Sequence, residues 1–248
     1  HWYDMPNQRV RTIENKMVAE VFQPGWLRAV GAGYVSWSIE QHIDELANHL
    51  GRDPVDYRLA MLKGQGKNEG TFPNSVGGGT RMAAVLKRAA ELSGWVDRGN
   101  LPEDSGMGIA VGAGQERNMP TWVATVAKVK VNRETGEVKV EKITSVVDAG
   151  TIVHPDGALA QVEGSTLWGV SLALMEGTKV ANGTFEDRNL DSYTPLRMDQ
   201  VPELEIEFAS NDHFPAGLGE PGLIAVAPAI ANAINAAVGV RMRDMPIR

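Results

Sequence analysis

The chain has 248 residues, with 24 Lys plus Arg against 31 Asp plus Glu, which gives a formal net charge of −7. This acidic balance excludes general electrostatic binding of nucleic acid or of an anionic membrane surface. Hydrophobic residues make up 43% of the chain, which is enough to form a folded core. Because there is no cysteine, the chain has no disulfides, no cysteine-ligated zinc or iron–sulfur cluster and no thiol nucleophile.

The longest apolar run and the first residues of the sequence bear on two questions: whether the chain spans a membrane, and whether it is a fragment of a longer protein. The longest apolar run, 223–238, is rich in alanine and is interrupted by Pro228 and Asn232, so we expect no membrane span. The chain begins at His1, with no initiator methionine and no basic and apolar leader. We therefore expect a fragment or a processed subunit, and its compartment, cytoplasmic or periplasmic, stays open.

Helical patterns dominate the first hundred residues. The first predicted helix starts at Gly33 and has an apolar stripe formed by Val35, Ile39, Ile43, Leu46 and Leu50. Glu40 and Asp44 fall outside this stripe, and Gly51 ends the helix. Asp53 and the following proline start a short second helix, the glycine-rich stretch 63–79 reads as a loop, and a further helix is predicted from about residue 80 to 93.

Beyond Gly106 the period of the pattern changes to two. The runs 121–131 and 137–147 predict an antiparallel hairpin, and 204–209 predicts another strand. A mostly apolar, buried helix is expected over 158–175, a strand and turn over 179–189, and a last helix from Pro228 to Gly239. The class is α+β, with mixed or antiparallel strands and packed helices: a helical segment at 1–105 and an α+β segment at 106–248.

Histidines and glycine clusters give only weak functional signals. His42 and His49 are two helical turns apart, about 10.5 Å along the axis, which is too far to share one metal ion. His154 fits either contact with a ligand or a local hydrogen bond, with the local bond favoured. The glycines at 77–79 and at 106, 108 and 112 lack the strand-to-helix context of phosphate loops, so we interpret them as flexible connectors.

The segment 214–222 carries the strongest chemical signal. Here Glu220 is embedded among glycine and proline, directly before an apolar stretch that is expected to be buried. Burial removes hydration from a carboxylate and raises its pKa, which suits a general base near neutral pH. The alternative is a structural glutamate that caps the backbone amides of the loop, and the residues alone leave the two open.

Four segments in the expected order resemble the xanthine dehydrogenase and aldehyde oxidase family of molybdenum hydroxylases. They are the Gly-Glu-Pro-Gly motif at 219–222 with its following helix, the Asp-x-Gly segment at 148–155 leading to Gln-x-Glu-Gly at 161–164, the Arg-x-x-Gly loop at 28–31, and the Asp-Pro-x-x-x-Arg run at 53–58. The segments 193–198 and 202–206 resemble the isoquinoline 1-oxidoreductase large-subunit branch, which includes membrane-associated aldehyde dehydrogenases.

The resemblance implies roles for individual residues. Glu220 is expected to be the catalytic base, and Arg28, Gly31, Gln161 and Gly219 are expected to bind the cofactor. That cofactor is a molybdenum–pterin group, molybdopterin or its cytosine dinucleotide, whose dithiolene and not a protein side chain holds the metal. Two departures are a glycine at 222, where the family often has proline, and a histidine at 154, where asparagine is usual.

The resemblance also implies partners. The resemblance implies that the Gly-Gln-Gly and Gly-Phe cofactor loops of the family lie upstream of this chain, so the chain is expected to need the remaining large-subunit segment. An iron–sulfur subunit is expected to accept electrons, and the substrate is expected to be an aldehyde or an N-heterocycle. The alternative is a non-catalytic fragment or scaffold that folds but binds no cofactor alone. A large exposed apolar face would favour a fragment, and a hydrolase using Glu220 is weak because no second carboxylate has a comparable setting.

Overall fold

The computed structural model describes residues 2–7, 9, 11, 13–21, 25–64, 78–116 and 119–247. Its α-helices are α1 (Lys16–Val21), α2 (Val30–His49), α3 (Pro54–Met61), α4 (Gly78–Leu92), α5 (Pro155–Leu174), α6 (Pro221–Ile224) and α7 (Val226–Val238), with 3₁₀ turns at Trp95–Asn100 and Met198–Gln200. Its strands are β1 (Ser105–Glu116), β2 (Met119–Val131), β3 (Val138–Asp148), β4 (Val180–Ala181), β5 (Thr184–Phe185) and β6 (Glu203–Phe208). Most of the predicted 63–79 loop lies outside the described residues.

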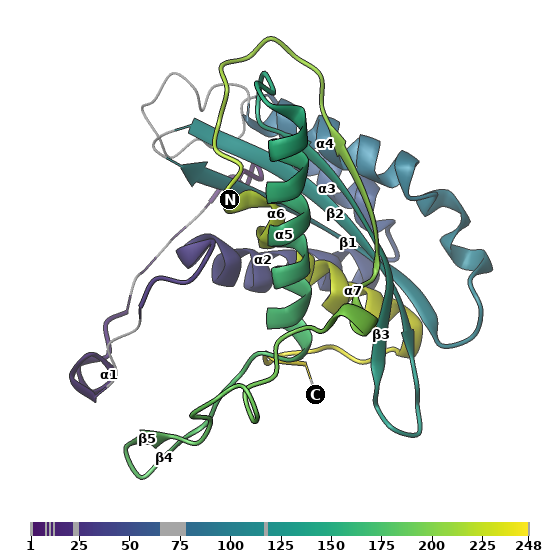
Figure 1. The fold of residues 1–248 in the computed structure, drawn as a ribbon. Helices are drawn as coiled ribbons and strands as arrows, with labels where there is room; N and C mark the ends of the chain where they lie inside the picture. Colours follow the sequence, from purple (N-terminus) through teal and green to yellow (C-terminus); the bar gives the residue numbers. More distant parts are fainter. Residues whose placement is uncertain are drawn as a thin grey trace.

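A four-stranded sheet in the order β1-β2-β3-β6 forms the centre of the fold (Figure 1). Strands β1, β2 and β3 are antiparallel neighbours, which confirms the predicted hairpin, whereas β6 pairs with β3 in parallel. The Asn132 side chain accepts hydrogen bonds from the amides of Glu134 and Thr135, and Gly136 has a φ of 76°, so the connecting turn has local reasons to form. The mixed sheet with packed helices confirms the α+β class.

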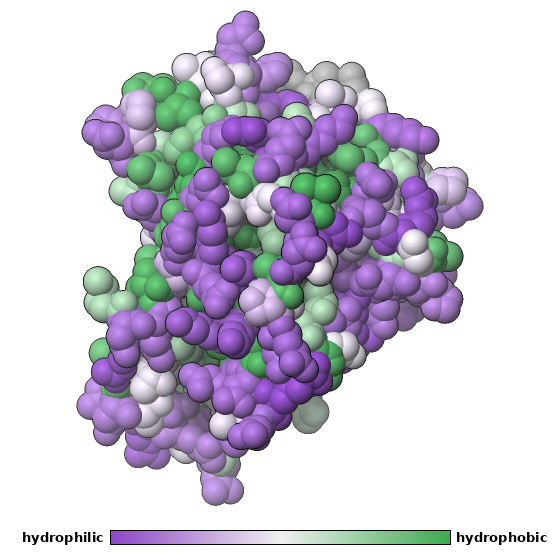
Figure 2. Space-filling view, turned by 90° about the vertical axis from the view of Figure 1, so that its right-hand side faces the viewer, coloured by the Kyte–Doolittle hydropathy of each residue, from purple (hydrophilic) through white to green (hydrophobic). Residues whose placement is uncertain are grey.

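Helices cover both faces of the sheet. On one face α5, α6 and α7 enclose an apolar core that includes Val123, Ala127, Ile143, Val147, Val162, Ile224, Val226 and Ile230. On the other face α4 and the α2–α3 pair enclose a second core that includes Ile43, Val85, Leu86, Met107, Ile109, Val111, Trp122 and Val126. Alternate residues of each strand enter opposite cores because side chains in a strand point to opposite faces. Hydrophilic side chains predominate on the outer surface beside α4 (Figure 2).

The interpretation of the glycines at 106, 108 and 112 as connectors is wrong. They lie in β1 and face the helices, where an added Cβ would approach the backbone of α7 to 2.4 Å at Gly106 and 2.1 Å at Gly108. At Gly112 it would lie 2.5 Å from the Ile224 side chain. Glycine is therefore needed because α6 and α7 pack directly on the strand. Gly78 and Gly79 are likewise not a connector, since α4 begins at Gly78.

Polar residues, and not the predicted apolar stripe alone, form the buried face of α2. Glu40 and Asp44 are 2% and 3% exposed, whereas Val35 and Leu50, which the stripe placed inside, are more than half exposed. The physical reason is the position of β1 at the edge of the sheet, where its outer backbone groups face no other strand among the described residues. Glu40 accepts a hydrogen bond from the amide of Val111 at 3.0 Å, so a side chain of α2 takes the place of a neighbouring strand.

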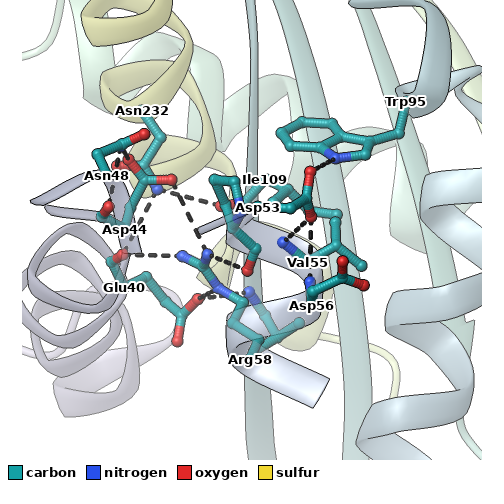
Figure 3. A network of polar contacts seen from close by, with 12 residues as sticks. Glu40, Asp44, Asn48, Asp53, Val55, Asp56, Arg58, Trp95, Ile109 and Asn232 are labelled. Carbon is teal, nitrogen blue, oxygen red and sulfur yellow. Dashed lines mark hydrogen bonds and ion pairs between the residues drawn. The ribbon is translucent and has the colours of Figure 1, made fainter. Parts of the chain in front are cut away.

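The Glu40 carboxylate also holds the buried Arg58 (Figure 3). Arg58 Nε lies 2.9 Å from Glu40 Oε2, and Arg58 Nη2 donates to the backbone oxygen of Glu40 at 2.9 Å. The hydroxyl of Tyr3 donates to the other carboxylate oxygen at 2.7 Å, and burial together with the charge of Glu40 raises the pKa of Tyr3 well above its ordinary value. Asn232 of α7 donates to the Ile109 carbonyl at 3.1 Å and so covers the next position of the β1 edge.

Helix ends mostly follow the sequence signals. Asp53 caps α3 by accepting from the amides of Val55 and Asp56, and Gly51 and Gly239 both have the positive φ of helix-ending glycines. The last helix starts earlier than predicted, because α7 begins at Val226 and the preceding Pro221 starts the separate helix α6. The predicted strand and turn at 179–189 is confirmed as the β4–β5 hairpin, which extends away from the sheet (Figure 1).

Candidate functional site

Three segments that are far apart in the sequence meet at the side chain of Arg28. Its Nε donates a hydrogen bond to the carbonyl oxygen of Gly219. Its Nη2 lies 3.1 Å from Oε1 of Gln161 and 3.3 Å from the backbone oxygen of the same residue. Arg28 precedes α2, Gln161 lies on α5, and Gly219 directly precedes Glu220 at the start of α6. The structure thus brings together residues that the sequence selected from separate motifs.

The turn that carries Arg28 has an uncommon backbone conformation. Ala29 and Val30 have φ values of 73° and 40°, in the left-handed region. A β-branched residue is rare there, and such conformations cost roughly 1–3 kcal/mol each and cluster at functional sites. The amide of Val30 donates to the carbonyl of Leu27 at 2.8 Å, which closes the turn, and α2 starts immediately. Gly31 therefore lies in the first turn of a 20-residue helix, where it is exposed.

Glu220 stands at the N-terminal end of α6 and is half-buried, so it is less enclosed than the sequence led us to expect. Its side chain makes no capping hydrogen bond to α6. Its backbone oxygen accepts from the amide of Leu223 at 3.1 Å. The backbone of Glu220 is thus held on both sides, by the Gly219 carbonyl at Arg28 and by the first turn of α6.

The loop 209–220, which delivers Glu220, is fastened to the corner between β3 and α5. The amide of Ala216 donates to the Ala149 carbonyl at 2.8 Å, and the amide of Thr151 donates to the His213 carbonyl at 2.9 Å. Thr121 donates its hydroxyl proton to the Gly217 carbonyl at 2.7 Å. The loop is therefore tied to the sheet along most of its length before it reaches Glu220.

Asp148 is the buried anchor at the start of this corner. Arg81 binds its carboxylate through both Nε and Nη2, Asn211 donates to it at 2.9 Å, and the amide of Gly150 donates at 3.1 Å. Burial raises the pKa of Asp148, but the hydrogen bonds from Arg81, from the Gly150 amide and from Asn211 outweigh it, so the pKa lies below its usual value. The Arg81 guanidinium also lies over the ring of Trp122, with 4.1 Å between Cζ and the ring centroid.

The two departures from the family pattern have local explanations. A Cβ at Gly222 would lie 2.2 Å from Oγ of Ser165, so the close approach of α6 to α5 requires glycine there. His154 caps α5, since its Nδ1 accepts from the amide of Gly157 at 2.8 Å. It therefore makes the local hydrogen bond that the sequence favoured. Within the described ranges no three His, Cys, Asp or Glu side chains are placed to share a metal ion.

A pocket of about 490 Å³ lies beside Arg28, between the start of α2, the second half of α5, and α6. Most of its lining is apolar, and includes Leu27, Val30, Tyr34, Leu172, Leu223 and Ile224. Neither Glu220 nor Gln161 lines it, so the pocket and the residues selected from the sequence share Arg28 alone.

The sequence did not reveal all the residues that support this site. Trp168 lies beneath Arg28, with 5.9 Å between the ring centroid and Cζ, and Arg81 holds Asp148. The sequence could have indicated Trp168, because Trp168 follows Gln161 by seven residues on the same helix and therefore lies on the same side of that helix. No local pattern could have indicated Arg81, since its partner Asp148 is 67 residues away in the chain.

Residues 41–202 match the family described as the molybdopterin cofactor-binding domain. A membrane-bound aldehyde dehydrogenase [pyrroloquinoline-quinone] from Gluconacetobacter polyoxogenes is 52% identical over the whole chain, which covers 32% of that protein. Isoquinoline 1-oxidoreductase subunit beta from Brevundimonas diminuta is 35% identical over 99% of the chain, which covers 29% of that protein. The chain therefore spans about a third of the length of these relatives.

The fold has matches among solved structures. The aldehyde oxidoreductase from Desulfovibrio desulfuricans superposes with a TM-score of 0.73 at 16% identity, over 90% of this chain and 40% of that one. The aldehyde oxidoreductase from Desulfovibrio gigas gives a TM-score of 0.69 at 16% identity, over 87% of this chain and 40% of that one. With the family match over most of the chain, these likenesses in sequence and in fold show that the chain belongs to the molybdopterin cofactor-binding domain family.

Proposed function

We propose that this chain supplies the general base and one wall of the cofactor site in a molybdenum-dependent oxidoreductase. The enzyme would oxidise an aldehyde or an N-heterocycle with oxygen derived from water. The observation that carries this proposal is the Arg28 guanidinium, which joins Gln161 and Gly219 directly beside Glu220. Glu220 is the catalytic base, and Arg28, Gly31, Gln161 and Gly219 are the residues that face the cofactor.

The residues present fit a large group that brings its own metal ligands. Two helical glycines near Arg28 have no packing reason in the described chain, because a Cβ at Gly31 or at Gly164 would meet nothing within 4 Å. Glycine inside a helix costs roughly 1 kcal/mol relative to alanine, so a ligand that approaches the backbone closely explains both positions. Gln161, one turn before Gly164, is exposed and offers an amide that suits a pterin ring.

Each residue has a separate task in the proposed reaction. The bound molybdenum–pterin group, molybdopterin or its cytosine dinucleotide, supplies the electron-accepting centre and the oxygen to be transferred. The Glu220 carboxylate would accept a proton at this site, a task that requires a base within hydrogen-bond reach. Gln161 and the backbone at Gly31 orient the group, and Arg28 keeps the loop that carries Glu220 in contact with α5.

The proposed enzyme needs further polypeptide. Large apolar side chains are exposed in the stretch that surrounds Arg28: Trp26 is 92%, Tyr34 59%, Val35 54% and Val30 44% exposed. Such a cluster is typical of a surface that another segment covers, and we propose that the remaining large-subunit segment packs there and completes the cofactor site. An iron–sulfur subunit would accept the electrons, since this chain has no cysteine to bind such a cluster.

The apolar stretch Pro221–Val238 is long enough to span a membrane, but 72% of it is buried inside the fold. It forms α6 and α7, which pack on the sheet and enclose the core. We therefore propose that this stretch stays in the domain, and that any attachment to a membrane uses another part of the protein.

A second candidate cofactor comes from the name of one relative. The protein from Gluconacetobacter polyoxogenes is named as an aldehyde dehydrogenase with pyrroloquinoline quinone. The match of residues 41–202 to the molybdopterin cofactor-binding domain favours the molybdenum group. A domain that folds but binds neither group is the third possibility.

Analysis of the cofactor in the full-length protein, purified with its partner subunits, separates these possibilities. We expect close to one molybdenum per chain by mass spectrometry, and a fluorescent pterin after oxidation of the extract. The quinone without molybdenum would support the second candidate. The absence of both groups from an active preparation, or of activity from a preparation that holds molybdenum, would contradict the proposal.

A further inference from the structure

We infer that Arg28 is a positioning residue for Glu220: its guanidinium fixes the peptide that leads into Glu220 and so sets the direction of the carboxylate. This inference rests on the proposed function, in which Glu220 is the base. It assigns the side chain of Arg28 a task distinct from contact with the cofactor.

One peptide bond links the Arg28 guanidinium to the backbone of Glu220. Arg28 Nε donates to the carbonyl oxygen of Gly219, which belongs to the same planar peptide unit as the nitrogen and Cα of Glu220. A hydrogen bond to that oxygen therefore orients the plane that contains Glu220 Cα. The following residue is Pro221, and a residue before proline prefers extended backbone. Glu220 instead has φ −117° and ψ −34°, so contacts on both sides are needed to hold this conformation.

The Arg28 guanidinium is itself supported by residues of α5. Nη2 of Arg28 bonds to both the side chain and the backbone of Gln161, and the cation lies over the Trp168 ring. Both residues belong to α5, whose Ser165 packs directly against Gly222 at the other end of the Glu220 turn. Arg28 thus ties the peptide before Glu220 to the helix that also fixes the residues after it.

Arginine suits this position because of the shape of its side chain. The fork of the guanidinium presents Nε and Nη2 side by side, so one group binds two acceptors on different segments in a fixed relation. Lysine carries a single, rotatable ammonium group and cannot reproduce this fixed geometry. Glycine at 219 adds no side chain that could restrain the loop, so the hydrogen bond to its carbonyl adds a restraint directly before Glu220, beyond the bond that holds Gly217.

The test compares Arg28→Met, Arg28→Lys and Arg28→Ala in the full-length holoenzyme with its partners. The matched control is Arg88→Met, because Arg88 pairs with Glu207 on the surface and touches no residue of the site. We expect molybdenum and pterin to stay at the wild-type level, kcat to fall about 10- to 100-fold as for a misplaced catalytic group, and KM to change little. Hydrogen exchange should rise at the amides of 219–224 and stay unchanged in β2 and β3.

Chemical rescue distinguishes positioning from a general structural role. Methylguanidinium added to Arg28→Ala should restore part of kcat and part of the exchange protection at 219–224. It should restore nothing in Glu220→Gln, which has lost the base itself.

The inference would be overturned if Arg28→Met kept wild-type kcat and exchange, or if it lost molybdenum, which would make Arg28 a cofactor-holding residue. A rise of exchange throughout the domain without rescue would also overturn it, because Arg28 would then be a structural residue. Full turnover by Glu220→Gln is a different result: it would refute the proposed base, whatever the Arg28 variants show.

Discussion

Replacement of Glu40 by glutamine tests whether a buried side chain of α2 stands in for a strand at the edge of β1. Glu40 accepts from Tyr3 at 2.7 Å, from Arg58 at 2.9 Å and from the amide of Val111 at 3.0 Å. Glutamine has the same shape, but it removes the negative charge beside Arg58 and turns one acceptor into a donor.

The expected cost follows from burial. The Arg58 side chain is fully buried and that of Glu40 is 3% exposed, so the substitution leaves a buried guanidinium with Asp44 Oδ1 at 3.9 Å as its remaining nearby carboxylate oxygen. Breaking such a pair costs about 3–5 kcal/mol. At about 1.4 kcal/mol for each factor of ten, amide protection in β1 and α2 should fall by roughly two to three and a half orders of magnitude.

Hydrogen exchange by mass spectrometry in the full-length protein measures this loss by segment. The control Arg88→Met breaks an exposed pair and should leave protection in β1 and α2 close to that of the wild type. The double substitution Glu40→Leu with Arg58→Met removes both charges, which should recover the part of the loss caused by the unpaired guanidinium. It also removes the acceptor of the Val111 amide and of the Tyr3 hydroxyl, so protection in β1 should stay below that of the wild type. Protection in β1 that stays within a factor of three of the wild type in both Glu40→Gln and the double substitution would refute the edge-capping role.

Three further predictions concern the corner that holds the Glu220 loop. Because the pKa of Asp148 is lowered in the folded protein, Asp148 stabilises the fold at pH values above its unfolded pKa of about 3.9. This stabilisation is lost as the pH falls through the folded pKa, so hydrogen exchange at 209–216 should rise there in the wild type. Asp148→Asn should abolish this pH dependence. Gly222→Pro should destabilise the protein by about 1–3 kcal/mol, because the added side chain would be overpacked against Ser165. A Tm equal to that of the wild type would contradict the explanation that close packing requires glycine at 222. His154→Ala should lower the free energy of unfolding by about 1 kcal/mol, because it removes the cap of α5. His154→Asn should leave it nearly unchanged, because asparagine can also cap a helix. Equal losses of Tm in the two variants would argue against capping.

Local sequence signals predicted the elements well where the cause is itself local. The hairpin of β2 and β3, the cap at Asp53 and the helix-ending glycines depend on nearby residues and are confirmed. The glycines of β1 were misread because their reason is the approach of α6 and α7, more than a hundred residues later in the chain. Burial of Glu40 was missed for the same reason, since it depends on which strand lies at the edge of the sheet.

The candidate site shows the same division. Arg28, Gly31, Gln161, Gly219 and Glu220 were selected from motif resemblance, and the structure joins three of them through one guanidinium. Their proposed roles toward the cofactor stay predictions. The supports at Trp168 and Arg81 act through tertiary contacts that no local pattern specifies.

The most direct test of the central claim is turnover by Glu220→Gln in the full-length enzyme with its partner subunits, with molybdenum measured on the same sample. The control is Glu207→Gln, which changes a surface carboxylate paired with Arg88. If Glu220 is the base of a molybdenum–pterin site, Glu220→Gln keeps its molybdenum and pterin and loses kcat by about 10²- to 10⁴-fold, while Glu207→Gln stays active. Turnover of Glu220→Gln at the wild-type rate, with molybdenum bound, would contradict that claim.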